Sequence, residues 1–286
     1  MVEDQKIASD KFILRDSIQE TMLGPLWARA TYSKLYPDLL NDKKAIEIID
    51  KLDYDFSYVK EFLTGKDGTN IFRSLGLLAR AKNFDIALLK FMEDRPETTV
   101  VNIGAGLDTT FSRVDNGAIK WYDLDLPDAI EFRKQFLPEG PRNKCIEKSV
   151  FDESWYEEIK WEKKKGIFFI VGGLVYYFKE QELKKLFSTM ARHFQEGEII
   201  FDVVSKVAMR KFNSIAKKLG KDEALYFSVK NPEKLFPIWS DRIQVKDWHV
   251  LWTRIELNPS WNKSTKRMIK VARSLKTSKI IHLKFL

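Results

Sequence analysis

Cysteine and histidine are scarce in this chain. Among its 286 residues Cys145 is the single cysteine, and there are three histidines, at positions 193, 249 and 282. One cysteine cannot form a disulfide within the chain, and histidines so far apart do not predict a metal cluster. We therefore expect no metal site, and a reducing cytoplasm fits the composition best.

Long apolar segments are also missing. The N-terminal stretch MVEDQKIASDKFIL has no basic patch followed by an apolar core, which an export signal would show. The most apolar segment, IFFIVGGLVYYF, has 12 residues, whereas a helix needs about 20 to span a bilayer. We expect a soluble protein without an export signal.

Charged residues of both signs are abundant. The chain has 49 Lys and Arg against 41 Asp and Glu, a formal charge of +8. This excess is compatible with nucleic acid, a membrane surface or an anionic small molecule as partner, and does not choose among them. Hydrophobic residues make up 44% of the sequence, which is enough for a substantial core in one structural unit.

Apolar periodicity changes at about residue 95. The stretch from residue 11 to about 95 has helical spacing, which predicts an N-terminal helical cap over residues 1–95. From residue 96 to 286, β-branched runs alternate with helix-like stretches, the pattern of βαβ units in a mostly parallel α/β sheet. The first five predicted strands are TTVVNIG, AIKWYDLD, IEKSV, GIFFIVGG and GEIIFDVVS.

The last part of the chain departs from this alternation. VKDWHVLWTRIEL and KIIHLKFL are two more predicted strands, separated by the basic helical stretch NKSTKRMIKVARSLK, so we expect this pair to lie antiparallel at one edge of the sheet. Periodicity is weak over about residues 206–240, which we interpret as an inserted helical lid or lobe in the core.

Two glycines follow the first predicted strand, in VVNIGAGLDTTFSR. Gly104 allows a tight turn, and Gly106 leaves out a side chain where a ligand approaches the backbone. Asp125 ends the next strand, 21 residues after Gly104, and a carboxylate there can accept hydrogen bonds from both hydroxyls of a ribose. Because ligands of open α/β sheets bind at the carboxyl ends of strands, this stretch predicts a nucleoside site.

A nicotinamide dinucleotide is the competing ligand. Such a site normally has a third glycine at the start of the helix that receives the pyrophosphate. That glycine is absent here, and Asp108 places a negative charge where the pyrophosphate would lie. A nucleoside with a positive centre, S-adenosylmethionine, fits better; Asp108 and Thr109 are in either case expected to cap the helix.

The motifs NIGAGLDT and DLDLP resemble those of the leucine carboxyl methyltransferase family, which includes the tetracenomycin-type polyketide O-methyltransferases. PLWARA, LLARAKNFD and SVFDESW extend the resemblance from about residue 21 to 178. It implies a Rossmann-like class I methyltransferase with a seven-stranded sheet whose last strand is antiparallel. It also implies S-adenosylmethionine as cofactor, bound by Arg29, Arg80, Gly104, Ala105, Gly106, Asp125, Leu126, Phe151, Asp152 and Gly172.

The resemblance also assigns roles. Gly104 would contact the methionine part of the cofactor, Asp125 the ribose, and Arg80 the cofactor carboxylate; without the family, Arg80 would be a solvated residue of an amphipathic helix. Asp152 would accept a hydrogen bond from the adenine amino group, with Phe151 or Glu153 beside it, or cap the next helix. Arg29 would reach the cofactor carboxylate or the substrate.

One departure from the family concerns the acceptor. After the fourth strand the family has an acidic residue, then Gly, an apolar pair and Tyr, whereas this chain has GGLVYYF from Gly172. The missing acid argues against the protein-methylating branch and for a small-molecule branch. Tyr176 and Tyr177 are then either substrate contacts or half-buried aromatics, and Arg242 is either a grip on an acceptor carboxylate or part of a surface salt bridge.

These observations predict an O-methyltransferase for a small-molecule carboxylate or hydroxyl, such as a polyketide. His193 and His249 are the histidines considered as a general base, and neither is assigned. The alternatives are a protein C-terminal carboxyl methyltransferase, a cofactor-binding protein without activity, and an RNA-binding or RNA-methylating protein. Residues 262–286, which contain eight Lys or Arg and no acid, favour the last of these. However, the apolar residues of that helix predict a solvated outer face over a buried inner one: Met268, Ile269, Val271, Ala272 and Leu275.

Overall fold

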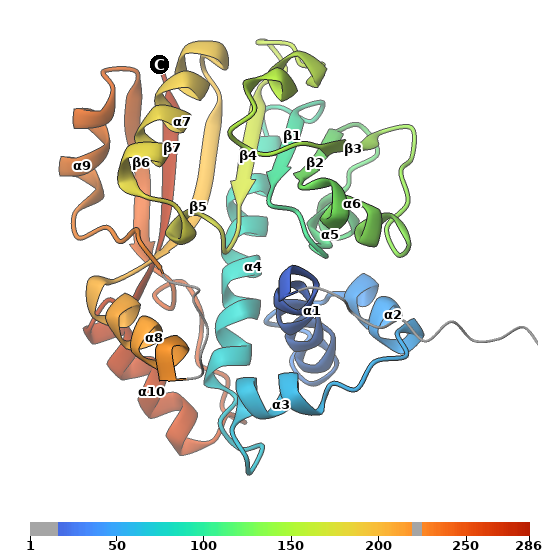
Figure 1. The fold of residues 1–286 in the computed structure, drawn as a ribbon, viewed down its shortest axis with the longest axis vertical. Coiled ribbons are helices and arrows are strands. Elements are labelled where there is room, and N and C mark those ends of the chain that lie inside the picture. Colours follow the sequence, from blue (N-terminus) through green and yellow to red (C-terminus); the bar gives the residue numbers. More distant parts are fainter. Residues whose placement is uncertain (1–16, 219–224) are drawn as a thin grey trace, which may run out of the picture.

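The computed structural model describes residues 17–218 and 225–286. Its strands are β1 Thr99–Ile103, β2 Lys120–Asp125, β3 Asn143–Glu147, β4 Ile167–Val171, β5 Glu198–Val204, β6 Ile243–Val250 and β7 Ser278–Phe285. They form one seven-stranded sheet in the order β3-β2-β1-β4-β5-β7-β6 (Figure 1). β1 to β5 are mutually parallel, whereas β7 is antiparallel to both β5 and β6. The predicted class of fold is confirmed, including the antiparallel last strand.

Helices precede the sheet and connect its strands. They are α1 Ser17–Leu35, α2 Lys43–Lys51, α3 Ser57–Thr64, α4 Phe72–Met92, α5 Thr110–Val114, α6 Pro127–Lys134, α7 Glu180–His193, α8 Lys206–Lys218, α9 Pro232–Trp239 and α10 Lys263–Ser274, with the 3-10 helices η1 Glu153–Glu158 and η2 Val175–Tyr177. From residue 17 the N-terminal stretch is helical, as predicted, and residues 1–16 of the predicted cap lie outside the described residues. The division at residue 95 stays a prediction; α4, which precedes it, packs against β4 and β5.

Both faces of the sheet are buried. Val101 and Phe169 belong to the apolar core that contains residues of α7 and α9, whereas Val100 and Phe168 belong to the core that contains residues of α4 and α10. Successive residues of a strand point to opposite faces, so every residue of β1 and β4 is buried. This explains why β4 is continuously apolar in the sequence and why β1 is mostly so, with Thr99 and Asn102 as its polar residues.

The carboxyl ends of the parallel strands meet at one edge, and α1, α2 and α3 lie beyond that edge (Figure 1). The long helix α4 extends from one face of the sheet past the same edge. A third apolar cluster joins Leu23 and Leu26 of α1 to Leu107, in the turn after β1, and to Phe132 of α6. The N-terminal helices therefore cover the region in which the sequence predicts the ligand.

Two strands and one helix differ from the prediction in detail. β3 begins at Asn143, before IEKSV, because its parallel pairing places Asn143 opposite Trp121 and ends with Glu147 opposite Asp125. β6 ends at Val250, well before the end of VKDWHVLWTRIEL. In α10, Ile269 and Ala272 are buried as predicted, but Val271 and Leu275 are exposed by 49% and 64%, so their assignment to the inner face was wrong.

The predicted insertion forms α8 and α9, and residues 219–224 within it lie outside the described residues. After this gap the chain runs beside η2, where the backbone N–H groups of Tyr226 and Phe227 donate to the carbonyl oxygen of Tyr176 at 2.7 and 3.2 Å. In the described parts of the chain, no helix is long and apolar enough to cross a membrane.

Candidate active site

The two predicted halves of the nucleoside site lie together at the ends of β1 and β2. Gly104 has a φ of +67°, a conformation that glycine adopts without strain, and its N–H donates to the carbonyl oxygen of Leu124 at 2.8 Å. Gly106 has a φ of +42°, and its N–H donates to Oδ2 of Asp125 at 2.8 Å. Between them, Ala105 is buried.

The space above the two glycines holds side chains of this chain. A Cβ atom on Gly104 would lie 2.8 Å from Cδ2 of Leu174, and one on Gly106 would lie 2.9 Å from the sulfur of Met22. Leu174 comes from the turn after β4 and Met22 from α1. A ligand that approaches the backbone at this turn must therefore displace both side chains.

Asp125 is anchored on both oxygens. Its Oδ1 accepts from the N–H of Leu126 at 2.8 Å, while its Oδ2 accepts from Gly106. Burial raises the pKa of Asp125, and the two backbone hydrogen bonds reduce that rise by favouring the ionised form. Leu126 itself is 40% exposed at the start of α6, where its side chain is accessible to a ligand.

Arg80 of α4 is largely buried, so the alternative of a solvated arginine is wrong. Its Nη1 lies 3.5 Å from Oδ2 of Asp202, with side chains 15% and 12% exposed. Burial acts to lower the pKa of Arg80, but Asp202, Tyr176 and Asp108 together outweigh this effect and the pKa is raised. Sequence reasoning missed Asp202, although an acid near the end of the apolar run GEIIFDVVS was a signal for it.

The turn after β4 lies next to Arg80. A Cβ atom on Gly173 would be 2.7 Å from Nη1 of Arg80 and 3.3 Å from the hydroxyl of Tyr176. Gly172 leaves room for a neighbour too, because a Cβ there would be 3.1 Å from the ring of Phe84. Burial raises the pKa of Tyr176, whose ring centroid lies 5.0 Å from that of Tyr177. Both tyrosines are half-buried.

Arg29 belongs to a buried network. Its Nε donates to Oδ2 of Asp42 at 2.9 Å and its Nη2 to the carbonyl oxygen of Leu107 at 2.8 Å. Arg113 donates to the same Asp42 oxygen and to both oxygens of Asp85. Through these contacts Arg29 links the N-terminal helices to the turn after β1. Its sequence motif did not indicate this structural role.

Asp152 caps η1, since its Oδ1 accepts from the N–H of Ser154 at 3.0 Å. Hydrogen bonds from the side chain and the backbone of Ser154 lower the pKa of Asp152. Phe151 is 41% exposed, and its ring meets that of Phe178 edge to face at 4.8 Å between centroids. The capping interpretation is confirmed, and a contact with adenine stays a prediction.

Arg242 and His193 lie elsewhere. β6 runs parallel to β5, because β7 is antiparallel to both, so Arg242, just before β6, lies at the edge opposite Gly104 and Asp125. There its carbonyl oxygen accepts from the N–H of Leu286 at 2.8 Å.

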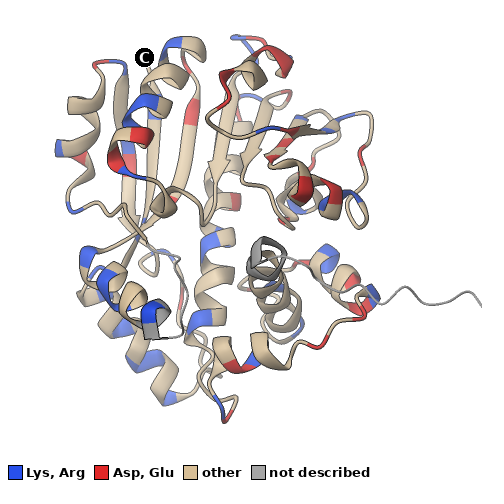
Figure 2. Ribbon diagram, viewed as in Figure 1, with Lys and Arg blue, Asp and Glu red and all other residues tan. Residues whose placement is uncertain are grey.

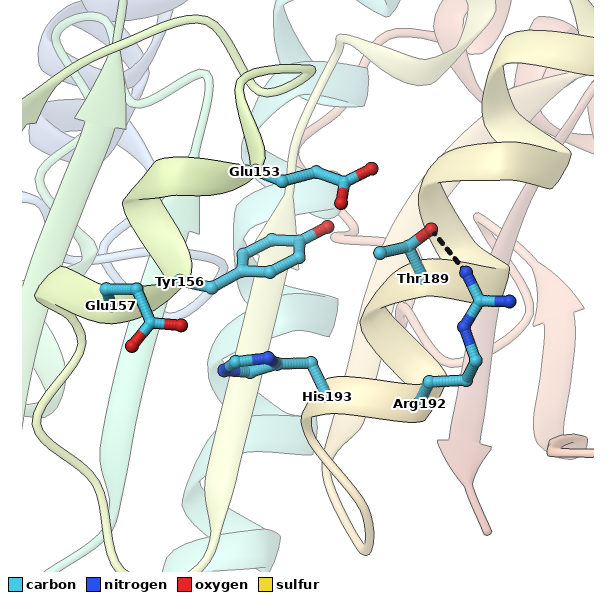
Figure 3. A pocket seen from close by; sticks show the side chains of 6 residues that line it. All are labelled: Glu153, Tyr156, Glu157, Thr189, Arg192 and His193. Carbon is cyan, nitrogen blue, oxygen red and sulfur yellow. Dashed lines mark hydrogen bonds between the residues drawn. The ribbon is translucent and has the colours of Figure 1, made fainter.

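His193 ends α7 and lines a pocket of about 340 Å³ between η1 and α7 (Figure 3). This pocket contains none of the predicted site residues; it is lined by Glu153, Tyr156, Glu157, Thr189, Arg192 and His193.

His249, by contrast, is near the carboxyl end of β6. Its Nε2 lies 2.7 Å from Oδ1 of Asn83, which follows Arg80 by one turn of α4. The amide nitrogen of Asn83 donates to the carbonyl oxygens of Ala79 and Leu251, so the Oδ1 atom accepts from the histidine. Burial lowers the pKa of His249 to about 4, and the ring is neutral at pH 7.

Comparisons with known proteins agree with this arrangement. The family described as leucine carboxyl methyltransferase matches residues 22–191. The tetracenomycin polyketide synthesis O-methyltransferase TcmP of Streptomyces glaucescens is 27% identical over 76% of this chain and 77% of its own length. The S-adenosyl-L-methionine-dependent methyltransferase dpfgK of Gibberella zeae is 25% identical over 70% of each chain.

Among solved structures, a protein of the DUF574 family from Streptomyces avermitilis shares the fold. The TM-score is 0.57 at 11% identity, and the match covers 91% of this chain and 96% of that one. The structural match shows the fold alone. The family match at residues 22–191 includes the glycine turn, Asp125 and the turn after β4, and it assigns the chain to a family. This chain belongs to the leucine carboxyl methyltransferase family and is an S-adenosylmethionine-dependent methyltransferase with a Rossmann-like class I fold.

Proposed function

We propose that this enzyme transfers a methyl group from S-adenosylmethionine to a carboxylate or hydroxyl oxygen of a small molecule. The observation that carries the proposal is the similarity to TcmP over 76% of the chain, combined with a turn after β4 in which Gly172 stands where the family has an acid. The departure separates this chain from the protein-methylating pattern, and the similarity supports an acceptor of the polyketide kind.

The chemical groups at the strand ends fit the cofactor. Asp125 offers a half-buried carboxylate for the ribose hydroxyls, and the bare backbone at Gly104 and Gly106 allows close approach. Arg80 offers a guanidinium for the cofactor carboxylate. Leu174 and Met22, which fill the space above the glycines, would have to move when the cofactor binds.

Two further contacts complete the proposed cofactor site. Asp152 would accept from the adenine amino group, because its exposed carboxylate keeps acceptor capacity beyond its bond to Ser154. The exposed faces of Phe151 and Leu126 would pack against the adenine ring. These three residues come from the segments that follow β3 and β2, so they would enclose the base from two sides.

When bound, S-adenosylmethionine supplies an electrophilic methyl group on a sulfonium. The enzyme's main task is then to hold the acceptor oxygen in line behind that methyl carbon, and positioning of this kind contributes about 7 to 11 kcal/mol. A carboxylate acceptor is already ionised at neutral pH, whereas a hydroxyl needs a base. His249 is neutral, but its Nε2–H group donates to Oδ1 of Asn83, so this nitrogen is not available to accept a proton from the substrate. The general base stays unassigned. Tyr176 and Tyr177 are the proposed substrate contacts, and Arg242, at the opposite edge, is not part of this site.

The test is methyl transfer from methyl-labelled S-adenosylmethionine to a panel of aromatic acids, phenols and polyketide-like acids. A methyl ester releases methanol in alkali and a methyl ether does not, so alkaline treatment of the product distinguishes the two acceptors. Labelling of a small molecule that Asp125→Ala abolishes supports the proposal. Labelling restricted to a peptide that ends in leucine would overturn it in favour of the protein-methylating alternative.

RNA is the second candidate acceptor, and one observation favours it. Lys and Arg are spread over α8 and α10 (Figure 2), and Lys263, Arg267 and Lys270 are exposed. The buried inner face of α10 also accounts for this pattern as an ordinary solvated helix. RNA affinity that falls steeply with salt, together with labelled RNA, would establish this candidate; S-adenosylmethionine binding without such affinity excludes it.

A further inference from the structure

An ion pair links α4 to the carboxyl end of β5. Nη1 of Arg80 lies 3.5 Å from Oδ2 of Asp202, and both side chains are largely buried. A charge-assisted hydrogen bond is shorter, at about 2.7 to 2.9 Å. The two charges therefore neutralise each other without the close contact of a fully formed hydrogen bond.

Asp202 is held in place by the turn after the neighbouring strand β4. Its Oδ1 accepts from the N–H of Gly173 at 2.7 Å, which leaves Oδ2 beside Arg80. The Gly172–Gly173 turn has no side chain of its own, and Arg80 lies against it. The negative charge at this turn therefore comes from β5.

We propose that Asp202 binds the α-ammonium group of S-adenosylmethionine while Arg80 binds its carboxylate. The two residues would exchange their mutual ion pair for the two charges of the amino-acid end of the cofactor. This inference rests on the proposed cofactor site and adds to it a residue that neither the sequence motifs nor the comparisons assign. It also provides a carboxylate at a site where Gly172 offers none.

Charge balance is the physical reason. A zwitterion that enters between Arg80 and Asp202 replaces one ion pair by two, so that no buried charge loses its partner. A ligand with a carboxylate but no ammonium group would draw Arg80 away and leave Asp202 buried and unpaired, which is strongly unfavourable. The pair therefore selects a zwitterionic ligand over one that carries a single negative charge.

The experiment is calorimetry with two ligands. S-adenosylhomocysteine has the amino-acid end, whereas 5′-deoxy-5′-methylthioadenosine keeps the nucleoside and the sulfur but has a methyl group in place of the amino-acid end. In Asp202→Asn, which keeps the size and an acceptor for Gly173, we expect affinity for S-adenosylhomocysteine to fall at least tenfold and affinity for methylthioadenosine to stay within twofold. The matched control Asp241→Asn, at an exposed position before β6, should change neither affinity.

A ligand-side measurement on the unmodified enzyme keeps the proposal testable if the variant does not fold. An S-adenosylhomocysteine analogue without the amino group should bind at least tenfold more weakly than S-adenosylhomocysteine. Equal binding of that analogue, or unchanged binding of S-adenosylhomocysteine to a folded Asp202→Asn, would overturn the role of Asp202 and leave the cofactor site intact. An unmodified enzyme that binds neither nucleoside would instead contradict the cofactor site itself.

Discussion

Oδ2 of Asp125, at the end of β2, lies 2.8 Å from the backbone nitrogen of Gly106, in the turn after β1. This hydrogen bond joins the two motifs from which the nucleoside site was predicted. It also fixes the carboxylate at the carboxyl edge of the sheet, where a ribose diol can reach it.

Replacing Asp125 tests the ribose contact. Asp125→Ala should weaken binding of S-adenosylhomocysteine by about 1.5 to 3 kcal/mol, the usual contribution of hydrogen bonds to a charged group. Calorimetry measures this directly. The control is Asp128→Ala, which removes an exposed carboxylate three residues further on and should leave the affinity unchanged. Unaltered affinity in Asp125→Ala would remove this residue from the site.

Gly104 tests the close approach of the ligand to the backbone. Gly104→Ala adds a methyl group at a φ of +67°, which costs about 1 to 2 kcal/mol in strain, and should also abolish tight binding of S-adenosylhomocysteine. Gly117→Ala is a matched control, because Gly117 has a φ of +80° and no described atom lies within 4 Å of its Cβ position. Both variants should melt at lower temperature, but only Gly104→Ala should lose binding. Equal binding by the two would show that the turn does not contact the cofactor.

Leu174 tests whether the site must open. Its side chain lies over Gly104 and would have to be displaced before the cofactor reaches the backbone. Leu174→Ala should therefore raise the association rate of S-adenosylhomocysteine in surface plasmon resonance. Leu235→Ala, which shortens another half-buried leucine of the same core on α9, should leave that rate unchanged. An unaltered rate in Leu174→Ala would mean that this side chain does not limit entry.

His249 makes stability depend on pH. Its pKa is lowered to about 4, whereas an unfolded histidine has a pKa of about 6.5. The unfolded chain therefore binds more protons between these values, so stability is full above pH 6.5 and falls as the pH decreases towards 4. Urea unfolding at pH 7 and pH 5 should show a loss of up to about 2 kcal/mol, reduced by partial solvation of the ring.

Substitutions separate this effect from general acid sensitivity. His249→Gln should lose less stability between pH 7 and pH 5 than the unmodified enzyme. His193→Gln, at an exposed position at the end of α7, should behave like the unmodified enzyme. The same pH dependence in all three proteins would assign the effect to other groups.

The sequence by itself determined the class of fold and the position of the two motifs that predict the nucleoside site. β-branched runs that alternate with helical periodicity predict a parallel sheet, and a glycine or an acid at the end of such a run is placed at one edge by the backbone alone. For this reason Gly104, Gly106 and Asp125 lie together as predicted. The cap role of Asp152 is equally local, because it depends on the next two residues.

Only the tertiary structure decided which distant side chains meet. It brings Asp202 of β5 to Arg80 of α4, directs Arg29 into a buried network, and places Arg242 at the far edge of the sheet. Such contacts depend on strand order and on how each helix packs across the sheet. Periodicity reports the buried face of an element but not the neighbour that it faces, so the sequence predicted a ligand site without indicating all the charges that would hold the ligand.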